Sequence, residues 1–273
     1  MSGDTGPEPV PPMLGRREKA QLRARWPEET VHRLNADFIR SIPKRSVWSM
    51  DELRAEFPDH QVAGKRYVDL RGFPFHELRH VTWDHVDLSG ASFLSSARRK
   101  QFLDPKLIGT GSVGSRFSRF KHCRFVGVDA TDANIAGGYE DCDFSASRLQ
   151  MMDFFVGVSL TRCSFRGANL ARSKAITDVR FAGCDFTGAS LKECRLQGTV
   201  FEDCVLDDTV LDGAGLMRVR FVRCYWRNVS LDNIIAEANV LIDTEVPAGT
   251  AARLTDALPA PGHLPWDAHD RER

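Results

Sequence analysis

Three histidines in the first third of the chain have the spacing of a metal site. His76 and His80 match the His-Glu-x-x-His signature of zinc proteases, and His85 follows closely. That chemistry needs an α-helix, because a helix places both histidines on one face with the glutamate as general base. Leu78 instead keeps step with a five-residue apolar pattern, and Pro74 lies just upstream. We interpret the match as coincidence and keep a metal site of His76, His80 and His85 as the alternative.

Cysteines are the other residues that could act as nucleophiles or metal ligands. Six of the seven are separated by 19 to 21 residues: Cys123, Cys142, Cys163, Cys184, Cys204 and Cys224. No pair has Cys-x-x-Cys spacing. Each stands two residues before a large apolar residue, where a thiol would be a small buried side chain. We therefore predict free, buried thiols, no catalytic residue, no cofactor and a reducing, cytoplasmic compartment.

A five-residue apolar period is the pattern that must position these side chains. From Ile176 to Leu241 every fifth residue is apolar, in a chain that is 42% hydrophobic. Chance would give such a run about five times in a million. The period is neither that of an amphipathic helix nor that of a strand. It indicates a repeat fold in which every fifth residue is buried.

The repeating unit reads small–x–large–polar–polar, as in the segments FRGANLARSK and FTGASLKECRLQGTVFEDCVL. In these segments the chain resembles the pentapeptide-repeat family, whose typical unit is Ala-Asp/Asn-Leu-x-x. The resemblance implies an all-β solenoid, a right-handed quadrilateral β-helix with four pentapeptides per coil. The cysteine spacing of about 20 residues independently supports four units per coil, and adjacent coils would lie about 4.8 Å apart.

The pattern predicts four regions along the chain. Residues 1–14 are expected to be a disordered tail, and residues 15–65 a helical N-terminal extension that caps the solenoid. In this extension Pro27 suits a first helical turn, and Ser49 with Glu52 forms a predicted capping box. Residues 66–246 would form about eight coils, interrupted by an insertion loop at 97–117. Residues 247–273 would carry a short C-terminal helix and a tail.

The charges are balanced overall but uneven along the chain. Lys plus Arg and Asp plus Glu both total 37, which gives no global signal for direct binding of nucleic acid. No apolar run reaches transmembrane length. The predicted partner-binding residues are basic in and beside the insertion and acidic in one coil: Arg98, Arg99, Lys100, Arg116, Arg119, Glu202, Asp203, Asp207, Asp208 and Asp212.

These features favour a non-catalytic protein-interaction scaffold, because solenoids present long regular surfaces around filled interiors. One branch of the family that the chain resembles binds DNA gyrase and related type II topoisomerases and protects against gyrase-targeting antibiotics as a DNA-mimicking acidic rod. The resemblance thus implies a topoisomerase partner and a possible homodimer through the C-terminal region. The chain departs from that branch in its mild acidity and its long N-terminal extension. The alternative is an enzyme or a ligand- or metal-binding protein, with its site between the extension and the first coils.

Overall fold

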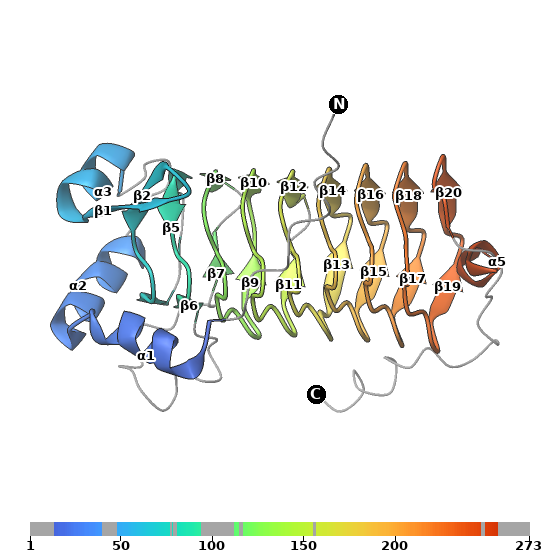
Figure 1. The fold of residues 1–273 in the computed structure, drawn as a ribbon, viewed down its shortest axis with the longest axis horizontal. Coiled ribbons are helices and arrows are strands. Elements are labelled where there is room, and N and C mark those ends of the chain that lie inside the picture. Colours follow the sequence, from blue (N-terminus) through green and yellow to red (C-terminus); the bar gives the residue numbers. More distant parts are fainter. Residues whose placement is uncertain are drawn as a thin grey trace.

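The computed structural model describes residues 14–39, 48–76, 78, 81–93, 112–114, 117–154, 157–246 and 249–255. It shows an elongated rod of stacked coils with helices at both ends (Figure 1). The predictions for residues 1–13, for 94–111 and for the tail after Thr255 lie outside the described residues.

The N-terminal extension packs three helices on the start of the rod: α1 (Arg16–Ala24), α2 (Glu28–Ile39) and α3 (Met50–Glu56). The predicted capping box opens α3. The Ser49 hydroxyl accepts from the Glu52 N–H, and the Glu52 carboxylate accepts from the Ser49 N–H at 2.7 Å. These contacts satisfy two backbone donors that the first turn of a helix leaves unpaired.

The extension is not wholly helical, which differs from the prediction for residues 15–65. Strands β1 (Asp59–Val62) and β2 (Lys65–Asp69) form an antiparallel hairpin. Its two turn residues, Ala63 and Gly64, both have positive φ, at 47° and 77°. Two-residue hairpin turns need this geometry, and the usual sequence signal is Asn-Gly or Asp-Gly. An Ala-Gly turn lacks that signal.

The rod is four-sided. We number its sides face 1 to face 4 in chain order. Face 1 is an eight-stranded parallel sheet: β4 (Thr82–Asp84), β8 (Arg119–Lys121), β10 (Gly138–Glu140), β12 (Ser159–Thr161), β14 (Arg180–Ala182), β16 (Val200–Glu202), β18 (Arg220–Val222) and β20 (Val240–Ile242). Face 4 is a seven-stranded parallel sheet: β7 (Ser112–Val113), β9 (Asn134–Ile135), β11 (Asp153–Phe154), β13 (Ala175–Thr177), β15 (Arg195–Gln197), β17 (Gly215–Met217) and β19 (Ile235–Glu237).

Faces 2 and 3 join successive coils mostly through single parallel bridges, such as Asp185 to Val205 on face 2 and Ser190 to Val210 on face 3. At the start of the rod these faces hold short strand pairs: β2 with β5 (Val86–Asp87), and β3 (Pro74–Phe75) with β6 (Ser92–Phe93). The described residues make seven complete coils, with a partial coil at each end. The quadrilateral β-helix is therefore confirmed.

The insertion ends earlier than predicted. Residues Ser112 and Val113 form β7, whose Val113 pairs with Ile135 of the next coil. The coil is therefore resumed on face 4 by residue 112, inside the range 97–117 that the sequence assigned to a projecting loop. The period could not show this, because the spacing from Val113 to the next core residue, Phe120, is not five.

The core consists of side-chain columns that run along the rod. Phe125, Phe144, Phe165 and Phe186 stack on face 2 with centroids 4.5 to 5.1 Å apart and rings nearly parallel. The six regularly spaced cysteines form a second column, and all seven thiols are free and buried, as predicted. The coil spacing sets both repeats.

Both ends of the core are covered. At the start of the rod, the buried ring of Phe38 contacts the rings of Phe73, Phe75 and Trp83. At the far end α5 (Thr250–Thr255) lies over the last coil, and its Leu254 is fully buried. The Leu254 carbonyl accepts from the Asn239 amide at 3.0 Å. None of the described helices is long and apolar enough to cross a membrane.

Candidate interaction surfaces and the histidine cluster

An open groove of about 690 Å³ lies on face 1 over β4, β8, β10 and β12. It exists because small residues follow one another at the corner from face 4 to face 1. Gly137 and Gly138 in one coil and Gly157 in the next place no side chain there. Outward side chains of opposite charge line the groove: Asp84, Arg119, Lys121 and Glu140.

The groove is accessible, and charged side chains stand along its sides. The Lys121 ammonium lies 3.6 Å from the Glu140 carboxylate, and both side chains are close to half exposed. Strand residues that point outward alternate with core residues such as Phe120 and Tyr139, which are buried beneath the groove. Its floor is therefore the packed core, and its walls are charged side chains that solvent reaches in part.

Arg119 is the predicted basic residue that the structure places in this groove. The other four, Arg98, Arg99, Lys100 and Arg116, lie outside the described residues. Their assignment to partner binding stays a prediction.

The five predicted acidic residues do not form one negative patch. They occupy three successive corners of one coil, with Glu202 and Asp203 before face 2, Asp207 and Asp208 before face 3, and Asp212 before face 4. Their separation follows from the period, because each corner turns the chain onto another face.

Most of these acids also have partners from neighbouring coils. Arg180 and Arg223 both bond Glu202, and their hydrogen bonds lower the pKa of that carboxyl. Arg223 also bonds Asp203 at 2.7 Å and lowers its pKa. Ser230 and the backbone N–H of Asp232 donate to Asp212. This coil therefore carries arginine-paired acids at the corner before face 2 and a hydrogen-bonded acid at the corner before face 4.

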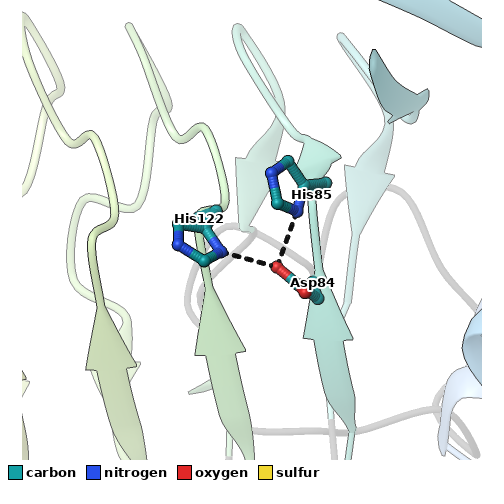
Figure 2. Close-up of side chains that lie close together, drawn as sticks. All are labelled: Asp84, His85 and His122. Atoms are coloured by element: carbon teal, nitrogen blue, oxygen red, sulfur yellow. Dashed lines mark hydrogen bonds and ion pairs between the residues drawn. The ribbon is translucent and has the colours of Figure 1, made fainter. Parts of the chain in front are cut away.

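Of the three histidines in the predicted metal set, the structure places His76 and His85, and the two lie in different surroundings. His76 is buried beneath the N-terminal helices, and its backbone N–H donates to the Asn35 side chain at 2.8 Å. His80 lies outside the described residues. His85 lies at the corner from face 1 to face 2, beside Asp84 and His122 (Figure 2).

Asp84 and His122 stand in no motif of the sequence that predicts a site. His85 and His122 each stand two residues after a core aromatic, Trp83 and Phe120, which was the available signal. The intervening insertion hid it, because the five-residue count cannot be carried across residues 94–111.

The thiols cannot serve as nucleophiles in this fold. Burial raises the pKa of Cys194 to about 12. Burial also raises the pKa of Cys142 and Cys163 well above the usual range. Each Sγ in this column faces backbone carbonyls, as where Cys142 donates to Phe120 at 3.5 Å. A thiolate at any of these positions would be desolvated, so the column is structural.

Four stacked sides and filled side-chain columns define a quadrilateral β-solenoid. Residues 174–243 match the family model described as "Pentapeptide repeat region". The matched stretch is thus a pentapeptide-repeat region, and the same coil geometry extends toward the N-terminus beyond it.

Several solved structures are similar to this chain. Full-length QnrB1, a plasmid-mediated fluoroquinolone resistance protein, is 17% identical over 65% of this chain and 87% of its own, with a TM-score of 0.24. Rfr23 from the cyanobacterium Cyanothece 51142 is 14% identical over 62% of this chain and 92% of its own, with a TM-score of 0.23. The thylakoid-lumen protein AT2G44920 from Arabidopsis thaliana is 17% identical over 45% and 79%, with a TM-score of 0.18. Such low identities and TM-scores carry no argument about function. A search of curated proteins found no match.

Proposed function

We propose that this chain is a non-catalytic scaffold that binds a protein partner in the groove of face 1. The observation that carries the proposal is a groove of about 690 Å³ on a rod whose interior is filled by side chains. A rigid concave strip lined by both charge signs suits a partner surface that carries charged side chains of both signs.

DNA gyrase is the first partner to test, because the sequence resembles a family with a gyrase-binding branch. The described structure offers less support for the DNA-mimicry part of that idea. A DNA mimic needs unpaired negative charge along its length, whereas Arg180 and Arg223 neutralise Glu202 and Asp203. We therefore infer recognition through the groove rather than through a duplex-like field.

A capture experiment tests the scaffold and its face together. Ser159 is exposed at the first position of β12, so a Ser159→Trp substitution would fill the groove without touching the core. Val240 occupies the same register position four coils further on, in β20, and Val240→Trp is the matched control. We expect partners captured from the native host by the wild type to be lost with Ser159→Trp and kept with Val240→Trp. Equal capture by all three proteins would refute the groove as the binding face.

Gyrase itself is tested in a supercoiling assay, with and without a quinolone, at micromolar protein. Inhibition or protection that Ser159→Trp abolishes would identify gyrase as the partner. If the protein changed supercoiling neither with nor without the quinolone, gyrase would be excluded. A partner captured from the host would then be another protein. A deletion of 95–110 with a short Gly/Ser linker then asks whether the insertion contributes, since its ends at Phe93 and Ser112 stay in their strands.

A further inference from the structure

His85 and His122 occupy the same corner of two successive coils, where face 1 turns into face 2. Both have left-handed backbones, with φ of 56° and 50°. The His85 N–H donates to the Lys121 carbonyl at 3.1 Å, and the His122 N–H to the Glu140 carbonyl at 2.9 Å. Because the backbone geometry repeats, the two imidazoles lie beside one another on adjacent coils, with ring centroids 4.6 Å apart and ring planes tilted by 34°.

Asp84 ends β4 and places its carboxylate between the two rings. Its Oδ1 lies 2.8 Å from His85 Nδ1 and 2.9 Å from His122 Nδ1 (Figure 2). The exposed fractions of the three side chains are 48% for Asp84, 32% for His85 and 31% for His122.

This donor set is that of a divalent transition metal. Two imidazole nitrogens and one carboxylate oxygen are ordinary Zn²⁺ ligands at about 2.0–2.2 Å. A tetrahedral site with such bonds separates its ligand atoms by about 3.4 Å. The three atoms all lie within 4.8 Å of one another. The two hydrogen-bonded pairs need to open by about 0.5 Å, a change that small side-chain rotations supply.

Asp141 adds an orienting contact. Its Oδ2 lies 3.6 Å from His122 Nε2, on the side of the ring away from Asp84. Arg162 holds this carboxylate through its Nε at 2.8 Å. Ligating histidines commonly donate their second ring nitrogen to a carboxylate, which fixes the tautomer and the ring orientation.

We propose that Asp84, His85 and His122 bind one Zn²⁺ ion, with Asp141 positioning His122 and the fourth ligand position open to water. The ion would tie the first complete coil to the second, on either side of the insertion in sequence. This site adjoins the groove of face 1, because Asp84 also lines that groove. It takes the place of the His76, His80 and His85 set that the sequence motif suggested.

Titration calorimetry of ZnCl₂ into the untagged, EDTA-stripped full chain tests the proposal. We expect saturable binding of one ion per chain. Asp84→Asn, His85→Asn and His122→Asn should each weaken it by a factor on the order of ten or more, and Asp141→Asn by about tenfold. Asparagine is the replacement of choice at both histidines, because it tolerates the left-handed backbone.

Two histidines outside the cluster provide controls. His32→Gln changes an exposed histidine on α2 and should leave the affinity unchanged. His80→Asn tests the His-Glu-x-x-His motif and should also leave it unchanged. Zn²⁺ should raise the melting temperature of the wild type and of both controls, but not of His122→Asn.

Three results would overturn the proposal: no saturable one-to-one binding, binding that survives both His85→Asn and His122→Asn, or binding lost with His80→Asn. Circular dichroism of the metal-free variants shows whether each is folded. Should Asp84→Asn fail to fold, the two histidine variants decide the question.

Discussion

At the scale of single residues, the stability of the rod comes from side chains that repeat at the coil spacing. Phe186 is fully buried and stacks on Phe165 at 4.9 Å, while it meets the edges of Phe181 and Phe201. Tyr225 lies near the far end of the rod, and the residue is 61% exposed. An aromatic residue thus belongs to the core at position 186 and to the surface at position 225, and burial is the difference between the two.

Phe186→Ala should lower the free energy of unfolding by about 3–5 kcal/mol, because the cavity has coils on both sides and cannot collapse. Tyr225→Ala removes a ring of similar size from the surface and should change it by less than about 0.5 kcal/mol. Urea denaturation of the two variants checks the difference. Equal losses would contradict the burial pattern.

The cysteine column should be chemically silent in the folded protein. Burial raises the pKa of Cys194 to about 12, so its thiolate forms only above the usual titration range. We expect none of the seven thiols to react with Ellman's reagent at about pH 8. All seven should react after denaturation in guanidinium. Rapid reaction of the native protein would show that the coils open.

At the scale of elements, the N-terminal extension is held to the rod by a buried carboxylate as well as by aromatic packing. Asp69 accepts two hydrogen bonds from Arg25, just after α1, and two from the Arg71 side chain, at 2.8 to 3.1 Å. Burial alone would raise the pKa of Asp69, but the bonds from Arg71 and Arg25 outweigh it and hold that pKa well below its usual range. The contact thus fixes α1 against the first partial coil.

This contact predicts an acid-sensitive attachment. Because the folded-state pKa is lowered, the stabilisation is complete above the ordinary Asp value and is lost as pH falls below about 4. Asp69→Asn should lower the free energy of unfolding by about 1–3 kcal/mol at neutral pH. The difference in free energy of unfolding between Asp69→Asn and the wild type should become smaller as the pH falls.

Asp243→Asn, at an exposed corner, is the matched control. Its free energy of unfolding should differ from that of the wild type by the same amount at every pH of the series. Urea titrations from neutral to acid pH give the measurement. If the difference in free energy of unfolding between Asp69→Asn and the wild type stayed constant across pH, the pKa of Asp69 would not be lowered in the folded state.

At the scale of the whole molecule, the rod stays a separate, folded unit only if both ends of its core are covered. Backbone edges of the last coil would otherwise pair with another chain. α5 supplies this cover through buried Leu254, and Arg253 donates to the Leu231 carbonyl at 2.6 Å. The helix is thus a cap on the far end, and the homodimer predicted through the C-terminal region stays a prediction.

Two truncations separate capping from dimerisation. A chain ending at Val246 loses α5 and should self-associate in a concentration-dependent way, because the last coil is uncovered. A chain ending at Thr255 keeps the cap and should fold like the wild type. Light scattering coupled to gel filtration gives the masses. A dimeric wild type that becomes monomeric on truncation after Thr255 would assign dimerisation to the tail instead.

The sequence by itself determined the coil, because each pentapeptide buries its own central residue and the signal is local. The period of five predicted which residues are buried, and the cysteine phase predicted the buried thiols. The resemblance to the pentapeptide-repeat family implied the four-sided solenoid, which the cysteine spacing supported. The Ser49/Glu52 box predicted the start of α3. The Ala63-Gly64 hairpin and the return of the chain at β7 carried no such local signal.

Only the tertiary structure decided where outward side chains meet. Contacts between coils depend on the summed length of everything between them, including the insertion and the corners of irregular length. His85 and His122 are far apart in sequence, yet their ring centroids lie 4.6 Å apart. Gly138 and Gly157 line one groove from adjacent coils. The acidic residues within 202–212 are close in sequence, yet they lie at three different corners of one coil. A period fixes what points inward, because the core is the same in every coil, while the outer surface depends on register between coils.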